Sequence, residues 1–128
     1  MAAATAFEIK AQVHIHITGQ TIDDIMCTAL EGGITGWCDC AEVVGGKYLG
    51  EYAHEQISRG GSLMLYDAES TDKWELDREK FLRGLRLWME DGDGICALNE
   101  GEVDAAFVDA EAADLIIQYA LFGEPVFG

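Results

Sequence analysis

The chain has 128 residues, of which 49% are hydrophobic and 25% are charged, and its formal net charge at pH 7 is −16. This length and apolar content suit one domain with its own core, so we expect a single acidic domain over residues 1–128 without wholesale disorder. The excess of negative charge disfavours direct binding of nucleic acid or anionic membranes.

The first element in the chain is an alternation over residues 7–18, in which the odd-numbered residues from Phe7 to Ile17 are apolar. This pattern predicts a half-buried strand that ends at Gly19. Thr21 then begins a predicted helix, which stops at the Gly-Gly pair after residue 31. Residues 34–46 show no clear periodicity, although several of them are of buried type and a second Gly-Gly pair indicates a turn.

The middle of the chain contains one predicted helix and one predicted hairpin. Apolar residues spaced along residues 47–58 indicate the helix, and a third Gly-Gly pair ends it. Two short apolar runs at residues 62–66 and 73–76 surround a polar loop, which is typical of a β-hairpin.

The last third begins with Asp77, which caps a predicted helix that extends to about residue 90. An acidic connection follows over residues 92–108, with a strand expected near residues 103–108. Asp109 caps the last predicted helix, and Gly123 ends it. We therefore expect an α+β fold, in which a small antiparallel sheet of three to four strands is covered by about four helices.

Three segments resemble short uncharacterised proteins encoded by phages and prophages of Gram-positive bacteria. The segments are residues 29–38 (ALEGGITGWC), 48–66 (YLGEYAHEQISRGGSLMLY) and 113–123 (ADLIIQYALFG). The similarity covers most of the chain from about residue 20 onward, and it identifies no catalytic residue. The resemblance implies a phage accessory gene, a class that includes many inhibitors of host defence.

One candidate site lies on the predicted helix over residues 47–58 and at its exit. At about 100° per residue, two tyrosines, a glutamine and an arginine fall within about a quarter-turn of one another, and glycines with accessible amides follow. Stacking rings, an amide and a guanidinium suit a nucleotide-like ligand. The alternative is rim packing, with the arginine paired to a nearby glutamate. The candidate ligand-binding residues are Tyr48, Tyr52, Gln56, Arg59, Gly60 and Gly61.

A second candidate site is the acidic C-terminal third, which contains no Lys or Arg after Arg86. A field of exposed carboxylates attracts cationic protein surfaces and imitates the phosphates of nucleic acid. The alternative is that these carboxylates only keep the protein soluble. The candidate partner-binding residues are Glu90, Asp91, Asp93, Glu100, Glu102, Asp104, Asp109 and Glu111.

We expect neither a metal nor another cofactor. His14 and His16 would share one face of the predicted strand, as metal ligands can, but no second ligand pair with zinc spacing accompanies them. Residues 91–94 (DGDG) resemble the start of a calcium loop. Ile95 and Cys96 stand where that loop needs an oxygen ligand and a glycine.

We also expect no catalytic residue, because the chain shows no nucleophile motif and no phosphate-binding loop. The first six residues lack the basic and apolar parts of a signal peptide, which predicts a cytoplasmic protein. Its cysteines are then expected to be free thiols: Cys27, Cys38, Cys40 and Cys96. The basic residues of the predicted helix over residues 77–90 are expected to pair with the acidic third rather than with nucleic acid.

These observations favour a phage-encoded, non-catalytic counter-defence protein that acts by stoichiometric binding. In the leading hypothesis its acidic surface blocks a cationic, nucleic-acid-binding surface of a host antiviral protein. In the second, Tyr52, Gln56 and Arg59 sequester a nucleotide-derived immune signal, in a pocket that a homo-oligomer could close. A structural or assembly protein of the virion is the third.

Overall fold

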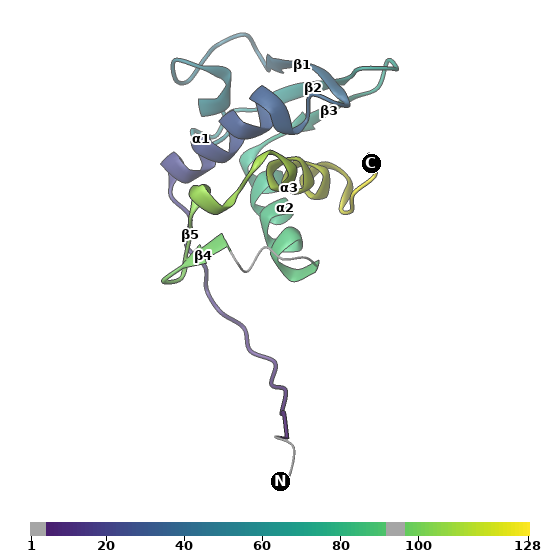
Figure 1. Ribbon diagram of the computed structural model, residues 1–128. Helices are drawn as coiled ribbons and strands as arrows, with labels where there is room; N and C mark the ends of the chain where they lie inside the picture. Colours follow the sequence, from purple (N-terminus) through teal and green to yellow (C-terminus); the bar gives the residue numbers. More distant parts are fainter. Residues whose placement is uncertain (1–4, 92–96) are drawn as a thin grey trace.

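The computed structural model describes residues 5–91 and 97–128 (Figure 1). The fold is α+β, as expected, with three α-helices in the described residues rather than about four. The elements in chain order are α1 (Gly19–Thr28), the π-helical turn η1 (Ala29–Gly33), β1 (Cys38–Val43), the 3₁₀ turn η2 (Ala53–Glu55), β2 (Leu63–Asp67), β3 (Lys73–Leu76), α2 (Arg78–Asp91), β4 (Leu98–Asn99), β5 (Glu102–Val103), the 3₁₀ turn η4 (Ala105–Phe107) and α3 (Ala110–Phe122).

A three-stranded antiparallel sheet of order β1-β2-β3 forms one end of the molecule (Figure 1). β2 and β3 are the hairpin predicted from the two short apolar runs, and Leu65 stands opposite Trp74 in their register. β1 had no clear signal in the sequence, and it pairs along the other edge of β2 with Val43 opposite Leu63. Leu63, Leu65 and Leu76 are fully buried, so one face of the sheet closes the core.

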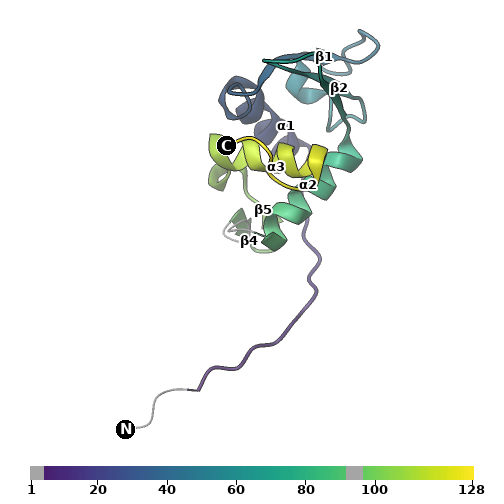
Figure 2. The same cartoon turned by 90° about the vertical axis from the view of Figure 1, so that its right-hand side faces the viewer.

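α2 and α3 pack against each other below the sheet (Figure 2). Both predicted caps are confirmed: Asp77 accepts a hydrogen bond from the Lys80 amide at 2.8 Å, and Asp109 accepts one from the Ala112 amide at 2.8 Å. Gly123 has a φ of 76° and ends α3 in the left-handed conformation that glycine favours. The caps therefore fix where each of the two helices begins, and Gly123 fixes where α3 stops.

The C-terminal tail folds back onto α3 through the buried side chain of Gln118. Its oxygen accepts hydrogen bonds from the amides of Val126 at 2.7 Å and Phe127 at 2.8 Å. Phe127 stacks on Trp37 with ring centroids 4.8 Å apart, and the Trp37 indole donates to Asp114 Oδ1 at 2.7 Å. These contacts join the tail, the segment before β1 and α3 into one packed unit.

The prediction of a strand over residues 7–18 is wrong. Residues 5–15 are extended and exposed, and they lead away from the rest of the molecule in both views (Figures 1 and 2). His16 alone forms a bridge, in parallel with Glu102. Alternation describes a strand with one apolar face, but it does not provide the neighbouring strand that would pair with the backbone. The helix predicted from Thr21 begins earlier, at Gly19, with Thr18 as its cap.

The prediction of a helix over residues 47–58 is also wrong. This segment consists of bends, the short turn η2 and a further turn that ends at Gly60, where φ is 88°. The buried amide of Gln56 accepts a hydrogen bond from the Leu49 amide and donates one to the Lys47 carbonyl. The segment therefore folds back on a polar side chain, which helical periodicity does not describe.

The strand expected near residues 103–108 is shorter and starts earlier, because β5 ends at Val103 and η4 follows it. β4 and β5 form a separate two-stranded sheet. No helix in the described ranges is long and apolar enough to cross a membrane.

Candidate functional site: an acidic cleft

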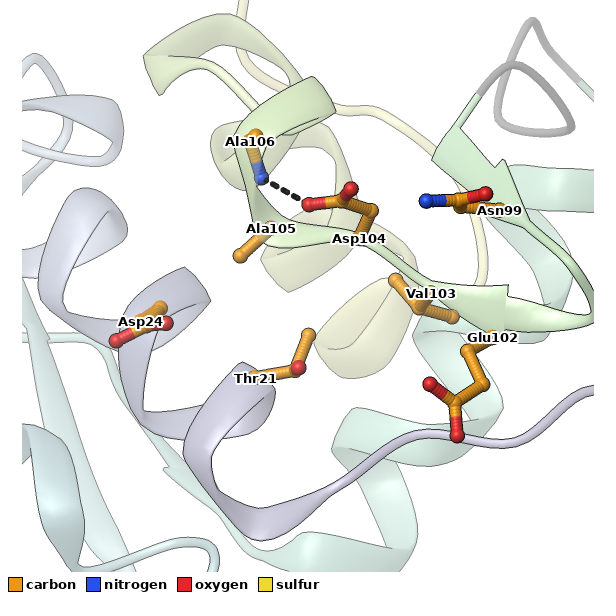
Figure 3. Close-up of a pocket in the computed structure, with 8 residues that line it drawn as sticks. All are labelled: Thr21, Asp24, Asn99, Glu102, Val103, Asp104, Ala105 and Ala106. Carbon is orange, nitrogen blue, oxygen red and sulfur yellow. Dashed lines mark hydrogen bonds between the residues drawn. The ribbon is translucent and has the colours of Figure 1, made fainter.

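An open cleft of about 430 Å³ lies between α1 and the segment that contains β4, β5 and η4 (Figure 3). Figure 3 shows α1 on one side of it and the β5–η4 segment on the other. Three carboxylates line the cleft, together with one amide, one hydroxyl and three small or apolar side chains. The lining residues are Thr21, Asp24, Asn99, Glu102, Val103, Asp104, Ala105 and Ala106.

Local backbone chemistry explains the shape of the β4–β5 side. Glu100 and Gly101 both have positive φ angles, of 53° and 81°, and make the tight turn that pairs β4 with β5. Asp104 then accepts a hydrogen bond from the Ala106 amide at 2.9 Å and thereby caps η4. Val103 is buried and anchors β5 to the core, whereas its neighbour Glu102 is exposed at the cleft.

The cleft carboxylates lack cationic partners in the part of the chain that the structure describes. Asp24 accepts a hydrogen bond only from the neutral amide of Gln20, at 2.9 Å. Glu102 accepts none from these residues, and Asp104 accepts only its capping amide. The ion pairs between described residues involve Arg59 and Arg86, and neither reaches the cleft. The cleft therefore presents uncompensated negative charge, which attracts an external cation.

The other predicted acidic residues are dispersed. Glu90 lies 3.9 Å from Arg86 in an exposed helical pair, and Asp91 is exposed at the end of α2. Glu100 is exposed in the β4–β5 turn, while Asp109 and Glu111 are exposed at the start of α3. Asp93 lies outside the described residues. Of the eight predicted acids, the structure places Glu102 and Asp104 together in the cleft.

Asp24 was not among the predicted partner-binding residues. It lies about 80 residues before Glu102 in the chain, and the sequence shows it only as an acidic residue early in a helix. α1 contacts η4, and this contact brings Asp24 to the cleft. No local sequence signal indicates that approach.

The predicted nucleotide site does not form a continuous stripe, because its helix is absent. Tyr48 and Tyr52 are 52% and 56% exposed, and the Tyr52 ring stacks on His54 at 5.4 Å. Gln56 is buried and its amide is used within the segment. Arg59 lies 3.3 Å from Glu55 and 3.6 Å from Asp23, so its guanidinium is already paired. Gly60 ends the turn and Gly61 follows it, and the ligand-binding role of the six residues stays a prediction.

Three of the four basic residues of α2 contact backbone oxygens, and the fourth forms an ion pair with a carboxylate of the acidic C-terminal third. Arg78 donates to the Ser58 carbonyl at 3.1 Å, and Lys80 donates to the Glu75 carbonyl at 2.7 Å. Arg83 donates to the Ala120 carbonyl at 2.8 Å, near the C-terminal end of α3, where a cation is favourable. The fourth basic residue, Arg86, pairs with Glu90 on its own helix.

The thiols and histidines do not assemble into a reactive or metal-binding group in the described residues. Burial raises the pKa of the Cys38 thiol, and burial together with the nearby Glu31 carboxylate raises the pKa of Cys27, so neither is activated as a thiolate. His14 is exposed on the extended segment before α1. No group of three His, Cys, Asp or Glu side chains there has a metal-binding arrangement. Cys96 and most of the DGDG sequence lie outside the described residues.

Comparison with known proteins found no match: no family model fits the chain, and neither a curated protein nor a solved structure is significantly similar to it.

Proposed function

We propose that the protein is a non-catalytic binding protein whose acidic cleft engages a cationic, nucleic-acid-binding surface of a host antiviral protein. The observation that carries this proposal is the set of three cleft carboxylates without a cationic partner among the described residues, in a chain of net charge −16. The phage setting comes from the sequence resemblance. An inhibitor encoded by a phage meets host antiviral proteins in the infected cell.

The chemistry of the cleft suits arginine or lysine side chains of a partner. Surfaces that bind nucleic acid use Arg and Lys to contact phosphate oxygens, and carboxylate oxygens accept the same charge-assisted hydrogen bonds. Asp24 and Glu102 carry such oxygens on two separate elements, so basic side chains of a partner would meet a carboxylate on either side of the cleft. The net charge of −16, to which the dispersed exposed acids contribute, would then guide the approach of the cationic surface.

A capture experiment with two charge-matched variants tests this proposal. Asp24→Asn with Glu102→Gln removes two cleft carboxylates, whereas Asp39→Asn with Glu42→Gln removes two exposed carboxylates of β1. Both variants change the net charge by the same amount. Immobilised wild-type protein and the β1 variant should retain the same host protein, and duplex DNA should displace it. The cleft variant should retain much less.

Equal retention by both variants would remove the cleft from the interface. If duplex DNA does not displace the retained host protein, the proposal that the cleft carboxylates imitate phosphates is wrong. If only virion proteins are retained, the protein belongs to particle assembly instead.

A second candidate function is sequestration of a nucleotide-derived signal. The exposed rings of Tyr48 and Tyr52 favour it, because such rings stack on nucleobases. The buried amide of Gln56 and the ion pairs of Arg59 weigh against it. Native mass spectrometry with cyclic and linear dinucleotides as probes tests it directly. Binding that Tyr52→Ala abolishes would place this function first.

A further inference from the structure

The segment before α1 exposes a row of apolar side chains that the fold does not use. This N-terminal arm (residues 5–18) extends away from the body of the molecule (Figures 1 and 2). Phe7 is 90% exposed and Ile9 is 86% exposed, whereas Ile15 is 37% exposed and Ile17 packs against the core. A row of exposed apolar side chains on an extended segment indicates an interaction surface.

The end of the arm already has the geometry of a strand. The His16 amide donates to the Gly101 carbonyl and the His16 carbonyl accepts from the Val103 amide, both at 2.9 Å, so His16 faces β5. Backbone groups of successive strand residues point to opposite edges. If the strand conformation continues along the arm, the N–H and C=O groups of the even-numbered residues face the same edge as those of His16. The N–H and C=O groups of the odd-numbered residues then face the opposite edge, away from β5. That edge is open to a further strand.

The arm is complementary to itself. The eleven residues from Phe7 to Ile17 are centred on Gln12, and an antiparallel pairing about a two-fold axis at Gln12 places every apolar residue opposite an apolar residue. Glu8 falls opposite the partner copy's His16, and Lys10 falls opposite the partner copy's His14. The apolar pairs are Phe7 with Ile17, Ile9 with Ile15, and Ala11 with Val13.

In the same register, the most exposed apolar side chains of one arm fall beside the least exposed apolar side chains of the other. Phe7, the most exposed apolar side chain, falls beside Ile17 of the second copy, which packs on that copy's core. Ile9 falls beside Ile15, which after Ile17 is the least exposed of the arm's large apolar side chains. Pairing therefore brings the outer end of each arm to the body of the other molecule, where apolar surface is available to remove it from water.

The charge distribution also selects the arm as the contact between copies. Glu8 and Lys10 cancel within the arm, so the net charge of −16 belongs to residues 19–128. Direct contact between two such bodies is opposed by repulsion. Pairing at Gln12 separates the two His16 residues by about 27 Å along the ribbon, at roughly 3.4 Å per residue. This separation exceeds the Debye length of about 8 Å at physiological salt, so most of the repulsion is screened.

We infer that the N-terminal arm pairs antiparallel with the arm of a second copy about Gln12, and that the two arms join the β4–β5 hairpins of both copies into one six-stranded sheet. A two-stranded ribbon alone is marginal in water, and the hairpin on each side supplies the further strands that a stable sheet needs. The inference does not depend on the acidic cleft or on its partner.

Cross-linking at single engineered cysteines tests the pairing and its register in the full chain. Gln12 meets Gln12 of the second copy as a non-hydrogen-bonded pair with Cα atoms about 4.5 Å apart, which a disulfide can span. Under mild oxidation Gln12→Cys should give at least about tenfold more disulfide-linked dimer than wild type. The wild-type protein is included to measure background cross-linking through the native cysteines. His14→Cys is the matched control, because its two cysteines lie about 14 Å apart in this register.

Mixing provides the decisive comparison. Lys10→Cys and His14→Cys should each stay near the wild-type background alone, yet an equimolar mixture should form the cross-linked heterodimer, since residues 10 and 14 face each other. Sedimentation equilibrium of the untreated wild-type chain should show a dimer, and Ile9→Asp should shift it to monomer without a change in the circular dichroism of the body. A monomeric wild type, or cross-linking at His14 as efficient as at Gln12, would overturn the inference.

Discussion

At Gly84 an added Cβ would lie 2.5 Å from the backbone nitrogen of Ala120 and 2.6 Å from the carbonyl oxygen of Ile116. These atoms belong to the backbone of α3 and cannot move aside alone, so Gly84→Ala must push α2 away from α3. We expect a loss of about 1–3 kcal/mol in the free energy of unfolding, which exceeds the helix propensity gained by alanine. Urea unfolding measures it.

Gly32→Ala is the matched control, because a Cβ at Gly32 would have no atom within 4 Å. This control should leave the free energy of unfolding nearly unchanged. Equal stability of the two variants would show that α2 and α3 do not cross at Gly84 as closely as described.

Gln118 holds the C-terminal tail, since its buried oxygen accepts the amides of Val126 and Phe127. Gln118→Ala should release the tail, uncover Trp37 and shift tryptophan emission to longer wavelength. We expect a loss of about 1–3 kcal/mol in stability, typical of buried hydrogen-bonding groups left without a partner. Deletion of residues 126–128 should lower the stability by nearly the same amount, and the stability losses of the two changes should not add when they are combined. Additive losses would mean that Gln118 does not act through the tail.

The roles of Gln118 and Gln56 could not be predicted from the sequence, because their hydrogen-bond partners lie in a tail and a loop. The sequence pattern predicts a ligand-binding role for Gln56 and none for Gln118, yet both amides are buried and hydrogen-bond to the protein's own backbone. Their partners are backbone groups whose positions depend on the path of a loop or a tail. By contrast, the capping roles of Asp77 and Asp109 could be predicted, because a cap acts within one helical turn.

The Glu55 carboxylate is one of the polar groups that hold the segment between β1 and β2, and its titration is expected to make part of the stability pH-dependent. Glu55 Oε1 accepts hydrogen bonds from the Tyr52 and Glu51 amides at 2.9 Å, and these bonds, with the Arg59 cation, lower the pKa of Glu55 below its ordinary value. A lowered folded-state pKa gives stability that is present above the unfolded-state pKa, about 4.3 for Glu, and lost as pH falls through the folded-state value.

Glu55→Gln should therefore destabilise the protein at pH 7, and the difference from wild type should shrink as the pH falls below about 4. Urea unfolding across this range measures the difference, and carbon NMR of the Glu55 carboxyl group follows its titration. Glu51→Gln removes a neighbouring exposed carboxylate and serves as the control. A difference that stays constant with pH would show that the carboxylate does not hold the segment.

Among the elements, α2, α3 and the β2–β3 hairpin could be predicted, because each combines a clear period with local start and stop residues. The segment over residues 47–58 could not, since polar side chains rather than an apolar stripe determine its path. Residues 7–15 of the N-terminal arm have a strand pattern without a strand partner among the described residues of their own chain. The strand prediction failed there because alternation describes a side-chain pattern and carries no information about a neighbouring strand.

For the whole molecule, the net charge predicts that partner binding depends strongly on salt. Exposed charges farther apart than about 10 Å are largely screened at about 0.1 M salt, so association driven by the acidic surface should slow as salt rises. The captured partner's association rate, measured by surface plasmon resonance, should fall steeply for wild type. A rate that does not change with salt would reject the acidic surface as the guide for association.

The candidate site is a property of the whole fold more than of any segment. The sequence predicts a partner-binding site of eight acidic residues in the C-terminal third. Glu102 and Asp104 are among them and line the cleft, whereas the other five that the structure describes are not part of its lining. The contact between α1 and η4 selects two of these positions and adds Asp24 from the opposite end of the chain. Contacts of such long range have no local signature in one sequence, so the cleft itself could not be predicted.

Phage plating tests the proposed function most directly. Host strains that each carry one antiviral system with a nucleic-acid-binding effector would express wild type, Asp24→Asn with Glu102→Gln, or Asp39→Asn with Glu42→Gln, all at equal folded levels. In at least one strain, wild type and the β1 variant should restore plaque formation and the cleft variant should not. Restoration by the cleft variant equal to that by wild type would contradict a role for the acidic cleft, and restoration in no strain would contradict counter-defence.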